Sequence, residues 1–399
     1  MTGWRMTDRY VTPEGAWPYY APDEVEAVRR VLESGRVNYW TGEEARLFEQ
    51  EFAVYHGTPH AIALANGTVA LEAALVALGI GPGDDVVVPS RTFVATAGAV
   101  VLHGARPVFA DVDADSGNVT AETIAAALTP HTRAVIVVHL GGRPCEMDPI
   151  LDLARERGLY VIEDCAQSHG ARYKGRLVGT LGHIGAFSFC QDKIMSTGGE
   201  GGMVITADEK LWRTMWSLKD HGKSWEAVYE RDHAPGFRWL HESFGSNWRL
   251  TETQAAVGRL QLHKLEAWVD RRRHNAEILM QALDGLEALR IPRPPRHIDP
   301  ACYRLYAYVR PENLAAGWNR DRILAELAER GAPSMSGSCS EIYLERCFAE
   351  AGLQPAERLP VARQLGETSL AFPVHPTLSE EHLAEWGQIA REVLLEATT

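Results

Sequence analysis

The sequence predicts an α/β fold with a mostly parallel central sheet flanked by helices, followed by a smaller C-terminal α+β domain. From about residue 60, short apolar runs rich in Val and Ile alternate with longer segments of helical periodicity. The short runs are apolar almost throughout, which is typical of parallel strands that are buried on both faces. The alternation ends after a long helical segment, where a proline-rich stretch (291–300) leads into a second set of elements.

The elements of the first domain follow one another as strand, helix and strand, the order of βαβ units in a parallel sheet. Strands are predicted at 84–90, 106–112, 133–140, 159–165 and 185–189. Helices are predicted at 67–79, 93–104, 120–129, 148–158 and 251–283. We expect the large domain to comprise 1–270 and the small domain 271–399. The small domain is predicted to hold strands at 304–310 and 368–374 and helices at 321–331 and 379–397.

Composition excludes several classes of protein. The 399 residues carry a formal net charge of −13, which argues against general affinity for nucleic acid or an anionic membrane. The six cysteines lack paired spacing, so neither a disulfide framework nor a zinc site is indicated, and His56 and His60 are separated by helix breakers. No membrane-spanning run and no signal-peptide pattern is visible. We therefore expect a cytoplasmic protein without a metal.

Ligands of open α/β sheets bind beyond the carboxyl ends of the strands, and chemically useful residues occur at these places. Gly67 and Thr68 open a helix, where free backbone N–H groups could hold a phosphate, although an ordinary helix cap has the same pattern. Asp164 ends a buried strand, where a carboxylate is costly unless a positive group meets it or it caps the next turn.

The stretch "SFCQDKIMSTGGEGGM" (188–203) places Lys193 between a strand and a cluster of glycines. In a poorly solvated pocket a lysine loses proton affinity and becomes a usable nucleophile, whereas a solvated loop lysine is the ordinary alternative. Asn247 and Arg249 precede the long helix, and nothing local assigns them a function. A phosphate anchor, an acid and a lysine together are the contacts that pyridoxal 5′-phosphate requires.

Several motifs carry a resemblance to a known family. The segments "NGTVAL", "TFVATAGAVVLHGARPVFADVD", "IEDCAQSHGA", "GHIGAFSFCQDKIMSTGGEGGMV" and "SNWRLTETQAA" resemble the DegT/DnrJ/EryC1/StrS family of sugar aminotransferases. The match covers roughly residues 30–270 in the expected order. It implies the fold of the fold type I enzymes that depend on pyridoxal phosphate.

The resemblance implies roles for the residues already singled out. Lys193 would be the Schiff-base lysine and would also move the proton during the reaction. Asp164 would pair with the pyridine nitrogen. Gly67, Thr68 and Ser188 would hold the phosphate.

Further residues match the family's motifs. Phe93 matches the aromatic residue that stacks on the ring, and Gln167 matches the residue beside the ring hydroxyl. Asn247 matches an asparagine that reaches the phosphate of a neighbouring subunit, so a homodimer with shared active sites is implied. Substrate contacts are expected from His221 and Arg249.

The implied reaction is amino transfer, with glutamate as donor and a keto sugar as acceptor. The sugar would be a nucleotide-linked 4-keto or 3-keto deoxysugar, although a sugar without a nucleotide is an alternative. Two segments depart from the family's pattern: residues 334–347 replace a His-Tyr-Pro segment, and residues 224–244 are long and aromatic. Either could line the substrate entrance.

Three other functions are open to this sequence. A dehydratase with the same cofactor is the nearest, since relatives that make aromatic amino acids by dehydration keep the lysine. A nicotinamide dehydrogenase is disfavoured, because G-x-x-G-x-x-G at 179–185 is not the dinucleotide-binding fingerprint. A sensor that binds the cofactor without turnover is the third.

Overall fold

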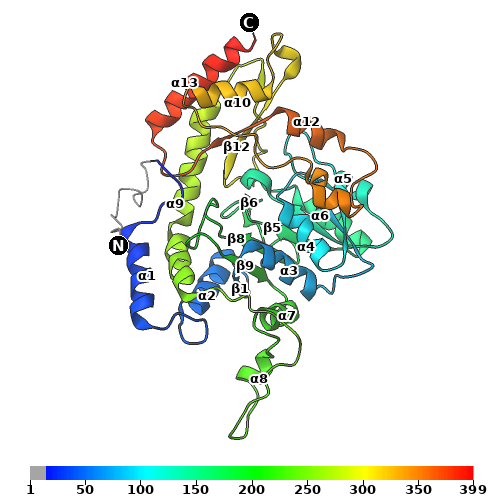
Figure 1. Ribbon diagram of the computed structural model, residues 1–399, viewed down its shortest axis with the longest axis vertical. Coiled ribbons are helices and arrows are strands. Elements are labelled where there is room, and N and C mark those ends of the chain that lie inside the picture. The colour runs from blue at the N-terminus through cyan, green and yellow to red at the C-terminus, as the bar shows by residue number, and fades with distance from the viewer. Residues whose placement is uncertain (1–14, 399) are drawn as a thin grey trace, which may run out of the picture.

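The computed structural model describes residues 15–398, so residues 1–14, at the start of the predicted large domain, lie outside the description. A 7-stranded sheet lies at its centre, in the strand order β1-β9-β8-β5-β4-β2-β3, with helices packed around it (Figure 1). Its strands are β1 (His60–Leu64), β2 (Asp85–Pro89), β3 (Arg106–Ala110), β4 (Thr132–Val138), β5 (Tyr160–Asp164), β8 (Ile184–Ser188) and β9 (Gly202–Thr206).

Five of the seven strands form the predicted parallel set. β8, β5, β4, β2 and β3 are parallel neighbours, and Val138 lies opposite Asp164 in the register of β4 and β5. β9 runs antiparallel to both β8 and β1. β1 therefore points in the same direction as the parallel set, and the carboxyl ends of β1, β8, β5, β4 and β2 lie at one edge of the sheet.

Helices cover both faces of the sheet. Along β2, Val86 and Val88 join one hydrophobic cluster while Val87 joins another, so the strand is buried on both sides as its apolar run predicts. The helices of this part are α1 (Pro22–Ser34), α2 (Glu44–His56), α3 (Gly67–Ala77), α4 (Val94–Leu102), α5 (Ala121–Ala127), α6 (Met147–Arg157), α7 (Glu209–Lys219) and α8 (Trp225–Tyr229).

The long helix α9 (Glu252–Ala282) connects the central sheet to the C-terminal part. Thr251 and Gln254 form a capping box at its start. A second sheet, in the order β10-β12-β13, follows with α10 (Arg320–Glu329) and α13 (Glu380–Glu396) packed together beside it. Its strands are β10 (Leu289–Arg290), β12 (Arg304–Val309) and β13 (Ser369–Pro373). The domain boundary at 270 stays a prediction, since α9 passes through it unbroken.

Short elements complete the fold. A third sheet joins β6 (Arg172–Tyr173), β7 (Arg176–Leu177) and β11 (Ile298–Asp299), and α11 (Arg346–Glu350) and α12 (Pro360–Thr368) lie beyond α10 in the sequence. The segment 224–244 begins with α8 and continues as an arm that projects from the body (Figure 1). Within residues 15–398, no helix combines the length and the apolar character needed to cross a bilayer.

Candidate active site

Lys193 lies just beyond the carboxyl end of β8. The turn that carries it is closed by its own N–H, which donates to the carbonyl of Cys190 at 3.0 Å. Its Nζ lies 3.2 Å from Asp192, and Asp192 in turn accepts a short hydrogen bond from the hydroxyl of Tyr303. The Lys193 side chain is only 17% exposed, so the amine is held against the protein rather than in open solvent.

The predicted loss of proton affinity at Lys193 is wrong for this arrangement. Burial alone would lower the pKa of the lysine, but the neighbouring Tyr303 and Asp192 favour the charged form more strongly. The pKa of Lys193 therefore lies above its ordinary value, and the amine is an ammonium at neutral pH. Sequence could not reveal this, because Tyr303 is 111 residues away from Asp192 along the chain.

Asp164, the last residue of β5, lies at the same edge of the sheet. Its Oδ2 accepts a hydrogen bond from Thr96 at 2.9 Å, and its Oδ1 accepts one from the N–H of Ala166 at 3.1 Å. Burial raises the pKa of this carboxyl, while those hydrogen bonds and the positive charge of Lys193 oppose the rise. Among residues 15–398 this buried carboxyl group has no ion-pair partner, and a cationic ring nitrogen would supply a positive charge.

The start of α3 forms a cradle with the end of β8. Asn66 caps the helix by accepting the N–H of Val69 at 3.0 Å, while the N–H groups of Gly67 and Thr68 have no acceptor among the described residues. A Cβ on Gly67 would lie 2.6 Å from the Cβ of Ser188, so only glycine allows this approach. Free N–H groups at the positive end of a helix, with two hydroxyls beside them, suit a phosphate.

Phe93 and Gln167 also lie at this edge of the sheet. Phe93 is the N-cap residue of α4, just before the helix begins. Its side chain is 67% exposed, which is a costly position for an aromatic ring. Gln167 accepts the N–H of Gly141 at 2.8 Å and reaches Ser338 at 3.5 Å. Ser338 belongs to the divergent segment 334–347, which therefore lies beside the predicted site.

The other predicted residues have structural partners of their own. Arg249 donates to the carboxylate of Asp220 at 2.6 Å, and the backbones of Asn247 and Asp220 form an isolated antiparallel β-bridge. His221 is exposed and adopts a φ of +59°, with its N–H bonded to Ser246. Within residues 15–398 no contact joins these three side chains to Lys193, so their roles stay predictions.

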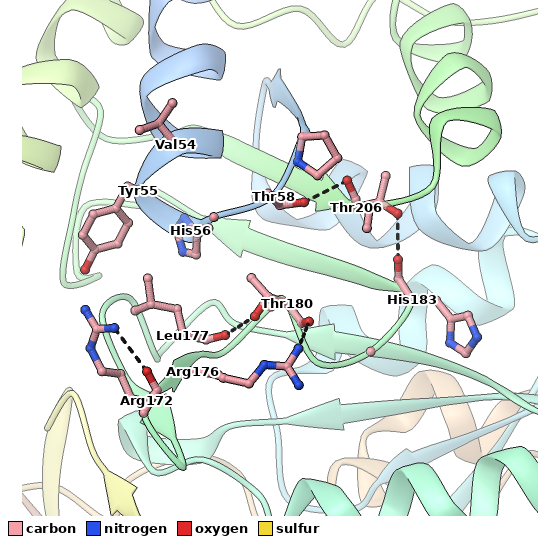
Figure 2. Close-up of a pocket in the computed structure, with 16 residues that line it drawn as sticks. Val54, Tyr55, His56, Thr58, Arg172, Arg176, Leu177, Thr180, His183 and Thr206 are labelled. Carbon is pink, nitrogen blue, oxygen red and sulfur yellow. Dashed lines mark hydrogen bonds between the residues drawn. The ribbon is translucent and has the colours of Figure 1, made fainter.

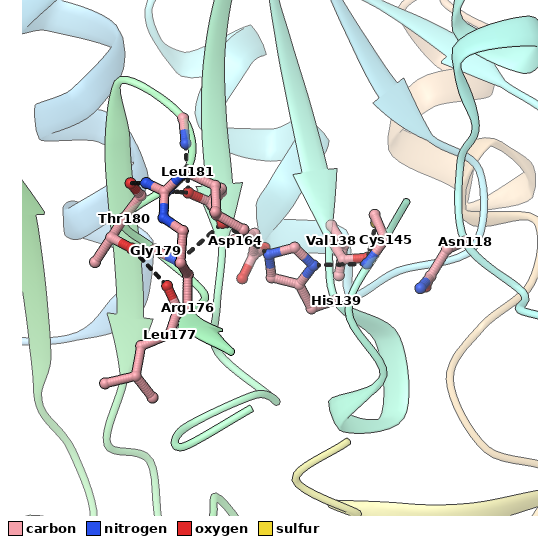
Figure 3. Close-up of polar contacts among 12 residues, drawn as sticks. Asn118, Val138, His139, Cys145, Asp164, Arg176, Leu177, Gly179, Thr180 and Leu181 are labelled. Atoms are coloured by element: carbon pink, nitrogen blue, oxygen red, sulfur yellow. Dashed lines mark hydrogen bonds and ion pairs between the residues drawn. The ribbon is translucent and has the colours of Figure 1, made fainter. Parts of the chain in front are cut away.

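Sequence reasoning missed a buried pair behind the site. Glu163, beside Asp164 on β5, accepts a hydrogen bond from the Nε2 of His139 at 3.1 Å. Figure 3 shows His139 at the end of its strand and the loop of Gly179 and Leu181 on the other side of β5. Glu163 also accepts the N–H groups of Gly179 at 2.8 Å, Leu181 at 2.7 Å and Gly182 at 2.6 Å.

The hydrogen bonds of the Glu163–His139 pair indicate a structural role. The Nδ1 of His139 accepts the N–H of Cys145 at 3.1 Å, so the ring's proton is on Nε2 and is donated to Glu163. Cys165 lies close enough to make a three-residue metal cluster with His139 and Glu163. Because both ring nitrogens and both carboxylate oxygens are engaged, we interpret the group as a hydrogen-bonded frame that holds residues 179–182.

A sequence model of the DegT/DnrJ/EryC1/StrS aminotransferase family matches residues 18–389. The chain belongs to this family. The sequence-based assignment is thereby confirmed, including the α/β fold and the aminotransferase class. Enzymes of the DegT/DnrJ/EryC1/StrS family depend on pyridoxal phosphate.

Curated relatives within this family act on sugars. The chain is 38% identical to UDP-N-acetyl-3-dehydro-alpha-D-glucosamine 3-aminotransferase of Acidithiobacillus ferrooxidans, over 94% of this chain and 96% of the relative. It is 37% identical to dTDP-3-amino-3,4,6-trideoxy-alpha-D-glucose transaminase of Streptomyces venezuelae, over 91% of each chain.

Two solved structures have the same fold as this chain. An aminotransferase from Psychrobacter cryohalolentis is 55% identical, with a TM-score of 0.95 over 97% of this chain and 100% of that one. A 3-amino-5-hydroxybenzoic acid synthase is 31% identical, with a TM-score of 0.85 over 96% of this chain and 99% of that one.

The residues at the carboxyl edge of the sheet fit pyridoxal phosphate. The cradle of Gly67 and Ser188 offers free donors to a phosphate, and Asp164 offers a buried negative charge to a ring nitrogen. Phe93 presents an uncovered ring face, and Lys193 supplies an amine.

Proposed function

We propose that this protein transfers an amino group from glutamate to a keto sugar, with Lys193 as the catalytic base. The preferred acceptor is a 3-keto or 4-keto deoxysugar carried on a nucleoside diphosphate. One observation carries the proposal: a shielded lysine amine lies at the sheet edge that also holds the buried Asp164 carboxyl and the α3 cradle. The names of the sugar-acting relatives support the acceptor class.

When bound, pyridoxal phosphate supplies an aldehyde that combines with amines and a ring that withdraws electrons from the carbon attached to that nitrogen. Gly67, Thr68 and Ser188 would hold its phosphate through backbone N–H groups and hydroxyls. Phe93 would cover one ring face. Asp164, kept in place by Thr96, would hold a proton on the ring nitrogen.

Lys193 would carry the proton between carbon atoms in both halves of the reaction. A base must first lose its own proton, and the Lys193 ammonium donates a hydrogen bond to Asp192 at 3.2 Å, while the Tyr303 hydroxyl donates to the same carboxylate. The same two residues fix the direction of the side chain. Tyr303 and Asp192 therefore act as positioning residues for the amine.

We expect cofactor capture to accelerate as pH rises toward the pKa of Lys193, because only the neutral amine attacks an aldehyde. Asp192→Asn removes a charge that raises this pKa, so capture at neutral pH should become faster and its pH profile should move to lower pH. Stopped-flow absorbance after mixing cofactor-free protein with pyridoxal phosphate measures both. An unchanged pH profile in Asp192→Asn would contradict the role given to Asp192.

Glutamate provides the test of the proposed reaction. The loaded protein should convert bound pyridoxal phosphate to the pyridoxamine form with glutamate, and release 2-oxoglutarate in equal amount. A panel of UDP-, dTDP- and GDP-linked keto sugars, with unlinked keto sugars beside them, should then identify an acceptor that restores the aldehyde form. Failure to form pyridoxamine phosphate with any amino acid would exclude amino transfer.

A dehydratase is the second candidate, favoured by the likeness to 3-amino-5-hydroxybenzoic acid synthase. That relative's name describes an aromatic amino acid, and its chain covers nearly all of this one. The same glutamate experiment separates the two functions. A dehydratase would release water from its substrate without using up an amino donor.

We also propose that the protein is a homodimer. The arm of residues 224–244 exposes Phe237 at 78%, Trp239 at 81% and Phe244 at 101% of their surfaces. Such a group of aromatic side chains on a projecting segment is costly in water and is typical of an interface. An arm that projects from the body of one chain could reach a second chain, which is consistent with an active site shared between two subunits (Figure 1).

Replacing Phe237 and Trp239 together by Ser should shift the protein from dimer toward monomer, since the buried apolar area of the interface would fall. Light scattering after size exclusion, at several concentrations, gives the mass. Leu395→Ser, a change at an exposed position on α13, is the matched control. A double variant that stays dimeric at the lowest concentration measured would place the interface elsewhere.

A further inference from the structure

A polar cavity lies at the edge of the central sheet opposite to Lys193. Its volume is about 470 Å³, and it opens between the end of α2, the β6–β7 hairpin and the loop that precedes β8 (Figure 2). His183 in that loop precedes β8, whereas Ser188 ends the strand at the candidate active site. The strand between them spans roughly 13 Å at 3.3 Å per residue, so the two sites are separate.

The cavity is basic in an acidic protein. Arg172 and Arg176 from the hairpin line it, and no Asp or Glu is among the lining residues, although the whole chain has a net charge of −13. Arg172 shares its charge with Glu266 at 2.8 Å. Arg176 donates only to the carbonyl of Thr180, at 2.9 Å, and makes no ion pair within residues 15–398. One guanidinium charge is therefore left for a ligand.

The lining presents hydrogen-bond donors. The Nδ1 of His183 accepts the N–H of Val161 at 3.0 Å, so the proton of the neutral ring is on Nε2, which is available as a donor. The hydroxyl protons of the lining threonines are already used: Thr58 donates to Thr206, Thr180 to Leu177 and Thr206 to His183, in each case to a backbone carbonyl. The side-chain donors left to recognise a ligand are the remaining N–H groups of Arg176 and of the Glu266-paired Arg172, and the imidazole N–H of His183.

Donors with a net positive charge recognise an anion rich in acceptor oxygens, and arginine forks match the geometry of phosphate. The volume exceeds what a single phosphate needs and lies in the range of small-molecule sites. Figure 2 shows Arg172, Arg176 and His183 spread across the cavity, so a ligand with more than one polar group would be needed to reach all three. We propose that this cavity binds a phosphorylated small molecule, a sugar phosphate or a nucleotide, apart from the site of amino transfer.

The wall of the cavity is rigidly held. Gly179 adopts a φ of +89°, and a Cβ there would lie 2.7 Å from the ring of Phe187. The N–H groups of residues 179, 181 and 182 all donate to the buried Glu163, the neighbour of Asp164 on β5 (Figure 3). A ligand would therefore meet arginines on a fixed support, which reduces the entropy lost on binding.

The test uses the loaded, full-length protein, in which the phosphate cradle near Lys193 is filled. Inorganic phosphate, pyrophosphate, glucose 1-phosphate and UDP are each added before brief modification of arginines with phenylglyoxal, and the modified peptides are mapped by mass spectrometry. We expect at least one ligand to protect Arg172 and Arg176 while leaving Arg155, an exposed residue on α6, unprotected. The ligand that protects at the lowest concentration identifies the source of the phosphate.

Calorimetry of that ligand with variants supplies the second measurement. Arg176→Ala should weaken binding to this site by about tenfold or more, the scale of one charge-assisted hydrogen bond, and Arg176→Lys by less. Arg155→Ala should leave the affinity unchanged, and any separate binding at the active site should persist in all three variants. Absence of protection up to about 10 mM, above the millimolar constant of a weak site, would overturn the proposal. Equal affinity in Arg176→Ala and Arg155→Ala would overturn it as well.

Discussion

Lys193→Ala is expected to lower the turnover of amino transfer by at least about 10²–10⁴-fold, the contribution of one positioned general base. The nearest lysines on either side in the sequence, Lys174 and Lys210, lie on an exposed hairpin and an exposed helix start. The pyridoxal phosphate contacts of Asp164, Gly67 and Ser188 would be untouched. Cofactor should therefore still bind, but reversibly.

Steady-state assays with glutamate and equilibrium dialysis of the cofactor measure the two parts of this prediction. Lys210→Ala removes an exposed lysine and serves as the matched control. Turnover within about tenfold of the wild type in Lys193→Ala would mean that another group moves the proton. Circular dichroism shows whether Lys193→Ala is folded. It therefore separates a loss of cofactor caused by unfolding from the catalytic effect.

Glu163→Gln is expected to destabilise the protein by roughly 2–6 kcal/mol, because two buried donors lose their acceptor at about 1–3 kcal/mol each. In the wild type, both carboxylate oxygens accept hydrogen bonds, from His139 and Gly179 on one and from Leu181 and Gly182 on the other. An amide has one oxygen, so its NH₂ group must face donors on one side. Two buried donors then lose their acceptor, and each such loss is costly.

Urea unfolding of Glu163→Gln and of Glu156→Gln, an exposed control on α6, gives the difference. The pKa of Glu163 is lowered by His139 and the backbone N–H groups, despite the opposing effect of burial. A lowered carboxyl pKa stabilises the folded state fully above the ordinary value of about 4.5 and loses that effect as pH falls through the lowered one. The difference in unfolding free energy between the wild type and Glu163→Gln should accordingly become smaller in acid. A difference below about 1 kcal/mol at pH 7 would contradict the frame assigned to this pair.

Much of the sheet could be predicted from local sequence. Val86, Val87 and Val88 are apolar at consecutive positions because the strand is covered on both faces, and Thr251 with Gln254 marks the start of α9 directly. Asp164 stands out in the sequence because a carboxylate at the end of a buried strand is costly, and its role stays a prediction. The rule that parallel strands gather their carboxyl ends at one edge then brought Lys193, Asp164 and Gly67 together.

The features of the sheet and the site that local sequence does not predict depend on contacts between distant parts of the chain. The antiparallel placement of β9 decides the direction of β1, and no local pattern announces it. Tyr303 follows α9 in the sequence, far from Asp192. Its hydrogen bond to Asp192 and its effect on the pKa of Lys193 therefore could not be predicted from local sequence. The pairing of Glu163 with His139 was hidden because both lie in runs that also read as strand.

Reduction of the loaded protein with borohydride, followed by peptide mapping, tests whether Lys193 is the residue that holds the cofactor. We expect the cofactor to become fixed to the nitrogen of Lys193, in nearly every chain, and Lys193→Ala to show no fixed cofactor. Attachment to a different lysine, or a wild-type protein that releases all of its cofactor after reduction, would contradict this expectation.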